Sequence, residues 1–299
     1  MANFHQSPTV ALIAAVLLAV VATSSNARGD DLRSLRNGVR NEKPKDDNDD
    51  DRPAKKKKKK ERSHDDDHHH HAHAHNHDDD GLEIGSIVVT GIVTSPYWIP
   101  AVALGDDYEL AAWFPDAPYE GVAGALVIDS PLPENSSDWI ARLRGEYSND
   151  FDNLNRAGSS LLLEHSSRFG IDTSWDYRYQ DLLVGHDDLW TGDFNIVYRF
   201  AQSERVQFRS GLGFNWLSDE IDTDFGFNFT YGADFFPAEP WVVSAVIDWG
   251  RLGNASLFHG RVTVGVVLDR FEIYTGYDYY DVGGTPLEGF IAGVGVWLN

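Results

Sequence analysis

The residue types best suited to chemistry in this sequence form a short histidine tract. Asp65–Asp67 and Asp78–Asp80 flank it, and its histidines are His64, His68, His69, His70, His71, His73, His75 and His77. Neutral imidazoles bind Zn²⁺, Ni²⁺ or Cu²⁺, and neighbouring carboxylates raise the local cation concentration. We therefore expect metal binding here, with a solvated polar spacer as the alternative. The tract would also gain positive charge in mild acid, because histidine titrates near pH ~6.5.

The tract belongs to a densely charged tail, residues 28–81, with almost no large apolar side chains. Such a segment cannot bury enough surface to offset its chain entropy, so the composition predicts disorder. Lys55–Lys60 could bind anionic lipid headgroups or cell-wall polymer, although acidic neighbours partly neutralise it. A plain linker is the alternative interpretation of this run.

The whole chain of 299 residues carries a formal net charge of −22 and no cysteine. We do not expect nucleic-acid binding, because contacts to phosphates need a basic protein surface. Without cysteine there is no disulfide framework and no thiolate chemistry. No required cofactor is expected.

The amino terminus has the pattern of a secretory signal. Residues 10–22 form an apolar run, and Ser25-Asn26-Ala27 supplies a small-x-small cleavage pattern. The run is short for a bilayer-spanning helix, which needs about 20 apolar residues. We expect a signal peptide over residues 1–27, with an uncleaved anchor as the alternative.

The segment 138–299 alternates apolar and polar residues with a period of two, which is typical of strands. In 223–235, for example, Phe225, Phe227 and Phe229 share one face. Ten strands are expected, at 138–148, 157–165, 169–179, 190–200, 205–216, 223–235, 241–250, 257–268, 270–280 and 289–298. Their lengths suit tilted strands that cross a membrane, which need about 9–11 residues.

The connections between these strands are expected to alternate between long and short, as in outer-membrane barrels with long external loops and short periplasmic turns. An even strand number then puts both ends of the barrel segment, and the tail, on the periplasmic side. The fold class is therefore an all-β, antiparallel, up-and-down transmembrane barrel of about ten strands.

The polar faces of the strands would fill a narrow lumen with paired charges, since unpaired buried charges are costly. Ten strands enclose little more than side-chain volume, so wide-pore transport is not expected. The expected lumen network comprises Arg142, Arg144, Glu146, Asp172, Asp176, Arg178, Asp193, Arg199, Arg209, Asp234, Asp248, His259, Arg261, Glu272 and Asp278.

Residues 138–299 resemble a small bacterial outer-membrane β-barrel. The closing GFIAGVGVWLN is similar to the carboxy-terminal strand signal of that family. The order of signal peptide, His-rich tract and a barrel containing FHGRVTVGV and YTGYDYYDVG also resembles uncharacterised bacterial proteins of this type. The resemblance implies an outer-membrane location and a barrel architecture, and no activity.

A catalytic site is not evident from the sequence. Outside the tail and barrel interior, His165 lies near a short turn with two serines, and His186 lies in a loop beside two aspartates. His186 is the better candidate for proton transfer or metal binding, against a solvated loop histidine. Residues 82–137 contain a possible strand at Ile87–Val93 and several prolines. We expect an ordered lead-in that packs in or beneath the barrel.

The leading hypothesis is a non-enzymatic outer-membrane barrel with a structural or surface-interaction role and a periplasmic metal-binding tail. Outer-membrane lipid is the expected partner, with cell-wall polymer or a divalent metal reached through the tail. Three alternatives stay open: a metal buffer or sensor tethered by the barrel, a lipid- or peptide-processing barrel enzyme using His186 or His165, and a soluble exported β-sandwich.

Overall fold

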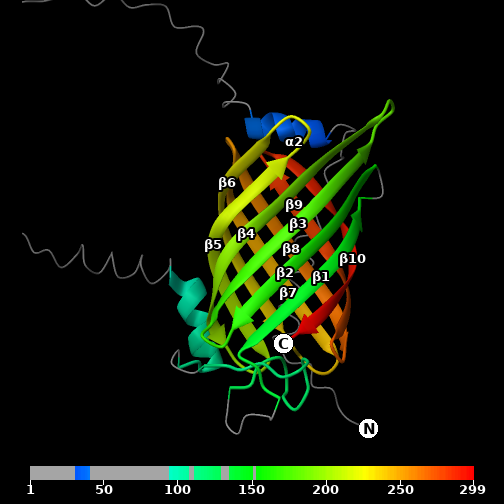
Figure 1. Cartoon of the computed structure of the whole chain (residues 1–299). Coiled ribbons are helices and arrows are strands. Elements are labelled where there is room, and N and C mark those ends of the chain that lie inside the picture. Colours follow the sequence, from blue (N-terminus) through cyan, green and yellow to red (C-terminus); the bar gives the residue numbers. More distant parts are fainter. Residues whose placement is uncertain (1–30, 41–93, 108–110, 129–134, 151–152) are drawn as a thin grey trace, which may run out of the picture. The chain divides into compact units, whose positions relative to one another are not determined.

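The structure is a computed structural model that describes residues 31–40, 94–107, 111–128, 135–150 and 153–299. Ten strands form one closed antiparallel barrel, in which each strand pairs with its neighbours in the chain and β1 pairs with β10 (Figure 1). The prediction of an all-β, up-and-down barrel is therefore confirmed. A soluble two-sheet sandwich is wrong, because a sandwich leaves its sheets unjoined.

Each strand overlaps the alternating segment from which it was predicted, and β1, β5 and β9 each begin one residue later than predicted. The strands are β1 (Trp139–Asn149), β2 (Leu154–His165), β3 (Phe169–Asp181), β4 (His186–Gln202), β5 (Val206–Ser218), β6 (Thr223–Phe235), β7 (Trp241–Leu252), β8 (Ala255–Leu268), β9 (Phe271–Val282) and β10 (Thr285–Leu298). Several extend beyond the predicted bounds because ladder hydrogen bonding continues past the last alternating apolar residue.

This extension removes the predicted difference in loop length. At the end of the barrel where β1 ends, the connections are 150–153, 182–185, 219–222, 253–254 and 283–284. At the other end they are 166–168, 203–205, 236–240 and 269–270. Both sets are short, so the prediction of alternating long and short connections is wrong. We call the first end the loop end and the second the C-terminal end, because β10 finishes there.

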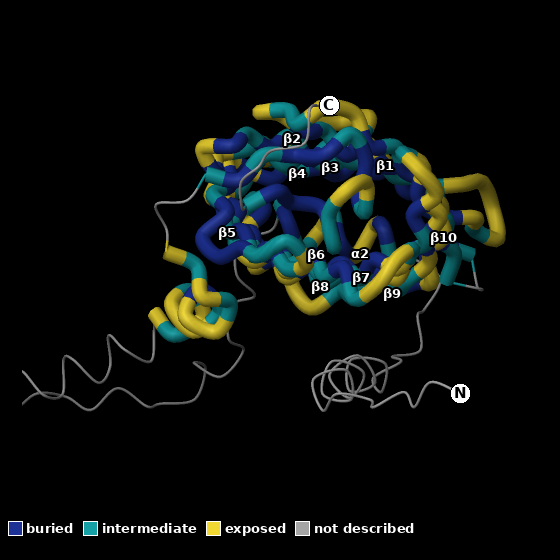
Figure 2. Tube along the Cα trace, turned by 90° about the horizontal axis from the view of Figure 1, so that it is seen from below, coloured by how far each residue is buried: buried dark blue, intermediate teal, exposed yellow. Residues whose placement is uncertain are grey.

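The two faces of the barrel wall differ sharply in chemistry. Outward-pointing Phe225, Ile196 and Val294 are about 60% exposed, at 62%, 61% and 62%. Inward-pointing Arg199 and Asp234 are 0% exposed. The burial pattern alternates along strands such as β6 and β10, and Figure 2 shows buried and exposed positions around the barrel wall. Apolar side chains on the outer wall and charged side chains in the interior are the reverse of a soluble barrel.

The loop end carries a helix, α2 (Asp31–Arg40) (Figure 1). Leu32, Leu35 and Val39 recur at helical spacing, and all three are 0% exposed against the barrel. Disorder was predicted for the whole of 28–81 and is wrong for α2, because its three apolar residues find a complementary surface that the tail itself does not contain. The rest of that tail lies outside the described residues.

Residues ahead of β1 cover the C-terminal end and part of the wall beside it. Residues 94–104 are helical, and Ala101 packs on Phe200. Phe114 and Leu126 lie in a cluster with Trp297 of β10. The possible strand at Ile87–Val93 lies outside the described residues. No described helix has the length and apolar character needed to cross a membrane.

Candidate functional site

The lumen of the barrel is filled by ion pairs between strands that are distant in sequence. Arg144 of β1 pairs with Glu272 of β9, with 2.5 Å between Nη2 and Oε1. Arg142 pairs with Asp234 of β6 at 3.0 Å between Nη1 and Oδ1. All four side chains are less than a tenth exposed. Each charge therefore has a partner that offsets the cost of its burial.

Two further arginines connect the network across the lumen. Arg209 lies 2.5 Å from Asp234 (Nη1 to Oδ2) and 3.6 Å from Asp172 (Nε to Oδ2). Arg199 donates to Glu164, with 2.9 Å between Nη1 and Oε1. Asp234 thus accepts from Arg142 as well as Arg209, which places two guanidinium groups on one carboxylate.

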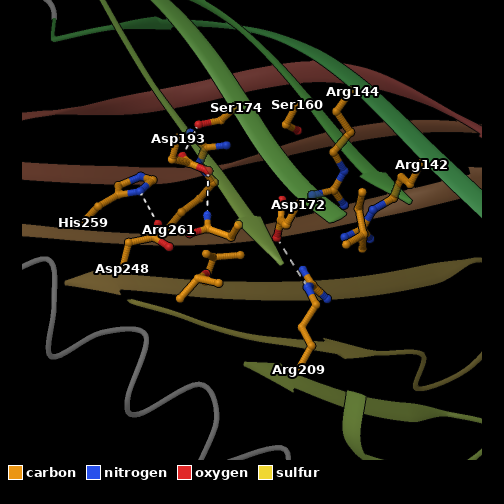
Figure 3. Close-up of a pocket in the computed structure, with 14 residues that line it drawn as sticks. Arg142, Arg144, Ser160, Asp172, Ser174, Asp193, Arg209, Asp248, His259 and Arg261 are labelled. Carbon is orange, nitrogen blue, oxygen red and sulfur yellow. Dashed lines mark hydrogen bonds and ion pairs between the residues drawn. The ribbon is translucent and has the colours of Figure 1, made fainter. Parts of the chain in front are cut away.

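His259 lies between two carboxylates in this network, and Figure 3 shows one of them, Asp248. Its Nδ1 is 2.8 Å from Asp248 Oδ2, and its Nε2 is 2.9 Å from Asp278 Oδ1. Asp278 also accepts from Arg261 Nε at 2.9 Å. Because both ring nitrogens are engaged, His259 has no free nitrogen for a metal ion or for general base catalysis in this arrangement.

The structure brings the sequence-predicted lumen residues together, and each faces the interior. Those in ion pairs are Arg142, Arg144, Glu146, Asp172, Asp176, Arg199, Arg209, Asp234, Asp248, His259, Arg261, Glu272 and Asp278. Arg178 instead lies over the ring of Tyr280, 4.5 Å from its centroid. Asp193 makes hydrogen bonds but no ion pair with any described residue.

One member of the network, Arg156, was missed by the sequence analysis. It lies in β2, where it contacts Glu146 at 2.7 Å and Asp176 at 2.6 Å. The expected strand began at residue 157, so Arg156 was placed in a loop. A signal was present, because Arg156 shares alternation parity with Gly158 and Ser160 on the polar face.

The cavities found among the described lumen residues are small. The cavity beside Arg142, Asp172 and His259 has a volume of about 50 Å³. A buried water needs roughly 10–15 Å³ by the same measure, so a few waters fit. A solute larger than that could not pass without displacing the ion pairs.

The loop end is closed by α2 through an apolar plug and a polar rim. The plug residues Leu32 and Leu35 meet a ring of strand-end side chains that includes Leu154, Leu189, Leu217, Leu252, Leu257 and Leu287. On the rim, Arg36 pairs with Asp187, and Arg40 pairs with Asp219 at 3.0 Å. Asn254 N–H donates to the Val39 carbonyl at 2.9 Å, which fixes the end of the helix on the β7–β8 turn.

Asp219 is the centre of this rim. Its side chain is 0% exposed, and burial alone would raise the pKa of its carboxyl. Hydrogen bonds from Arg40, from the backbone N–H groups of Asp222 and Ile221, and from Arg36 outweigh burial and hold that pKa well below its usual range. Asp219 therefore stays ionised, and keeps α2 bound, through mild acid.

The C-terminal end is closed by different contacts. Phe114 is 1% exposed, and the guanidinium of Arg199 lies 5.1 Å from its ring centroid. Arg168 forms a two-pronged pair with Asp106, in which both nitrogen–oxygen distances are 2.7 Å. This end is therefore sealed by apolar side chains that also cover a buried lumen charge.

The two candidate catalytic histidines lie at opposite ends of the barrel. His165 is at the C-terminal end, where its Nδ1 lies 2.7 Å from Ser167 Oγ and accepts the Ser167 N–H at 3.0 Å. These two contacts are those of a local turn. His186 is exposed at the loop end and stacks on Tyr179. The structure does not bring them together, so a joint site is not formed.

The predicted metal ligands His64, His68, His69, His70, His71, His73, His75 and His77 lie outside the described residues. Their metal binding stays a prediction. Among the residues that are described, no group of three or more His, Cys, Asp or Glu side chains is arranged around a metal position.

Comparison with known proteins gives structural similarity only. No known family matches the sequence, and no curated protein is significantly similar to it. The amino-terminal β-barrel domain of Pseudomonas aeruginosa OprF is 12% identical, with a TM-score of 0.27, over 53% of this chain and 97% of that domain. Ail, the attachment invasion locus protein of Yersinia pestis, is 13% identical, with a TM-score of 0.25, over 54% of this chain and 96% of Ail. At these values the functions of those proteins do not transfer to this chain.

Proposed function

We propose that this protein is an outer-membrane β-barrel with a closed lumen and a structural or surface-interaction role. The observation that carries the proposal is the reversed wall: large apolar side chains point outward and paired charges point inward. Monomeric soluble proteins rarely expose an apolar surface larger than a few hundred Å². A bilayer requires an apolar surface toward the lipid and internal partners for all backbone hydrogen-bonding groups. The apolar outer wall meets the first requirement, and the closed strand ladder meets the second.

The lumen chemistry supports a role other than transport. Arg144, Arg209 and His259 cross-link the wall from inside, and the remaining space suits water molecules only. Residues 111–128 cover the C-terminal end, and ion pairs that do not involve α2 fill the lumen between the two ends. The expected activity is therefore that of a rigid anchor, whose exposed loops and charged tail make the contacts with other components of the envelope.

A matched pair of arginine substitutions tests the membrane assignment. Phe227 points outward in the middle of β6 and is 55% exposed, whereas Phe271 points outward at the start of β9 and is 64% exposed. An arginine at the midplane of a barrel costs about 2–4 kcal/mol, and one near the interface about 0–1 kcal/mol. We therefore expect Phe227→Arg to impair folding into lipid vesicles and Phe271→Arg to have little effect.

The measurement is heat-modifiable gel mobility of protein folded into vesicles, together with fractionation of cells into inner and outer membranes. Wild type should fractionate with the outer membrane and show the mobility shift. Recovery of wild type as a soluble monomer without detergent would contradict the proposal. Equal folding of Phe227→Arg and Phe271→Arg would contradict the lipid-facing assignment of the wall.

The periplasmic metal-binding tail is a second part of the proposal and rests on the imidazole and carboxylate spacing of the tract. Calorimetric titration of the full chain with Zn²⁺ should show binding that is lost when residues 64–77 are deleted. A deletion variant that keeps the zinc affinity of wild type would remove the tail from the proposal without affecting the barrel assignment.

A further inference from the structure

One carboxylate in the lumen has no cationic partner. The inward acids are Glu146, Glu164, Asp172, Asp176, Asp193, Asp234, Asp248, Glu272 and Asp278. Within the described part of the chain, each of them except Asp193 lies within 4.0 Å of an arginine or of His259. Asp193 accepts hydrogen bonds from Ser174 Oγ and from Asn195 Nδ2, the latter at 2.8 Å. Neutral donors alone do not compensate a buried negative charge.

Two unpartnered oxygen atoms line a small cavity together with Asp193. Asn215 is 3% exposed and Asn228 is 1% exposed, and the Oδ1 atom of each has no hydrogen-bond partner among the described residues. Both residues line a cavity of about 20 Å³ with Asp193 and Asp248. Strand pairing places Asn215 of β5 directly opposite Asp193 of β4. The unpartnered amide oxygens of Asn215 and Asn228 therefore lie near the Asp193 carboxylate.

Hydrogen bonds fix which amide atom is left without a partner. Asn195 donates to Asp193, which can only accept when ionised, so the Asn195 Oδ1 atom is free to accept from Asn228 Nδ2 at 3.0 Å. Asn215 donates its Nδ2 to the Phe227 carbonyl at 3.2 Å. Asn215 and Asn228 therefore each use the amide nitrogen as a donor and leave the amide oxygen available to a ligand.

The lining of this cavity is rich in acceptors and poor in donors. It contains no arginine or lysine, and the other polar lining residues are Ser174, Asp176, Thr191, His259 and Tyr280. Both nitrogens of His259 are engaged by Asp248 and Asp278. Water could donate to the amide oxygens, but water cannot neutralise Asp193.

We propose that this cavity binds a single hard cation through oxygen ligands, of the Ca²⁺ type, between Asp193, Asp248, Asn215 and Asn228. Ca²⁺ takes carboxylate, amide carbonyl and water oxygens in flexible geometry, whereas Mg²⁺ demands a near-ideal octahedron. Zn²⁺ favours imidazole nitrogen and thiolate sulfur, and the one imidazole in the lining, His259, already has both nitrogens engaged. The ion joins β4, β5, β6 and β7 from inside, at a cavity whose lining contains no arginine.

The site is tested on the full chain, stripped with chelator under denaturing conditions and refolded in detergent with Ca²⁺, Mg²⁺, Na⁺ or none of these. Excess ion is removed by desalting, and retained metal is measured by elemental analysis. We expect one Ca²⁺ per chain and a rise in the melting temperature of about 5–10 °C when Ca²⁺ is a hundredfold above its Kd. Ions held by the acidic runs of the tail exchange rapidly and are lost on desalting.

Three conservative variants separate this site from a general effect of lumen charge. Asp193→Asn should retain no Ca²⁺ and lose the thermal shift. Asp172→Asn removes a lumen carboxylate that already faces Arg209, and it should retain one Ca²⁺. Asn215→Asp should bind Ca²⁺ at least about tenfold more tightly, because it adds a carboxylate ligand.

Each alternative outcome is distinguishable. Wild type that retains no metal and shows no shift with any cation would mean that water alone fills the cavity, and the proposal would be overturned. Equal retention by Asp193→Asn and wild type would place the ion elsewhere and also overturn it. Retention of Na⁺ or Mg²⁺ in place of Ca²⁺ would overturn the assignment of ion type. None of these results depends on where in the cell the barrel is located.

Discussion

The two ends of the barrel are closed by different means. At the C-terminal end, residues close to β1 in sequence supply Phe114 and Leu126, which cover Arg199 and pack on Trp297. At the loop end, the closing element is α2, which is separated from β1 by about a hundred residues. The longer connection adds only about 1 kcal/mol of loop-closure entropy, so the distant plug needs slightly stronger contacts than the local one.

Because the two covers lie at opposite ends of the barrel, we expect docking of α2, but not docking of the segment before β1, to differ between detergent and a bilayer. Residue 40 lies at the loop end and residue 97 at the C-terminal end, so residues 41–96 must join the two ends. That chain includes Lys55–Lys60, which cannot lie in hydrocarbon without great cost. Fully extended it reaches about 180 Å, so its length would allow a path around a detergent belt, while the cost of its charges in hydrocarbon opposes a path across a bilayer.

The largest expected effect follows from this connection: α2 docks in detergent and is released when the barrel is embedded in vesicles. Leu35 is 0% exposed in the docked state, and the chain has no native cysteine. In a Leu35→Cys variant, maleimide labelling should be at least about 100-fold slower in detergent than in vesicles, because labelling requires local opening.

Ser34→Cys is the matched control, since Ser34 is exposed on the same helix and should label rapidly in both environments. Slow labelling of Leu35→Cys in vesicles would contradict release of α2. That result would require residues 41–96 to pass through the lumen, or the barrel to lie outside the bilayer.

The next largest effect is expected at the C-terminal end. Phe114→Ala removes a buried ring from above Arg199 and leaves a cavity in the cluster with Trp297. We expect a loss of about 3–5 kcal/mol in the free energy of unfolding. Urea titration of barrel tryptophan fluorescence measures it, and an unchanged midpoint would show that this cover is not part of the cooperative unit.

A smaller and local effect is expected from Leu35→Ala in detergent. It should weaken docking of α2 by about 2–5 kcal/mol, while the unfolding midpoint of the barrel itself changes little. Proteolysis at Arg36, followed by mass spectrometry, reports the docked fraction. Equal losses in docking and in barrel stability would mean that the two ends are energetically coupled.

The smallest effect is expected from acid. The pKa of Asp219 is held below its usual range in the docked state, so its contribution to docking is complete above the unfolded value of about 3.9 and is lost as the pH falls below that. Docking should therefore be constant from about pH 8 to 5 and weaken below about pH 4. A loss of docking near pH ~6.5 would instead implicate the histidine tract.

Much of the barrel follows from local patterning, because alternation along a strand assigns each side chain to one wall face. The inward set from Arg142 to Asp278 and the outward set including Phe225 could be listed for this reason. Arg156 was missed because the expected strand began at residue 157, although the alternation of Gly158 and Ser160 extends to it. The predicted loop lengths were wrong because several other strand ends were also placed too far inside the true strands.

The sequence by itself determined ten strands, their two faces and the sign of each lumen charge, since these depend on residue type and a period of two. Only the tertiary structure decided which charges meet, that no described cationic side chain pairs with Asp193, and that α2 covers the loop end. Those outcomes depend on distances across a closed lumen and between segments remote in sequence. Such distances arise from closure of the barrel, and no local pattern encodes them.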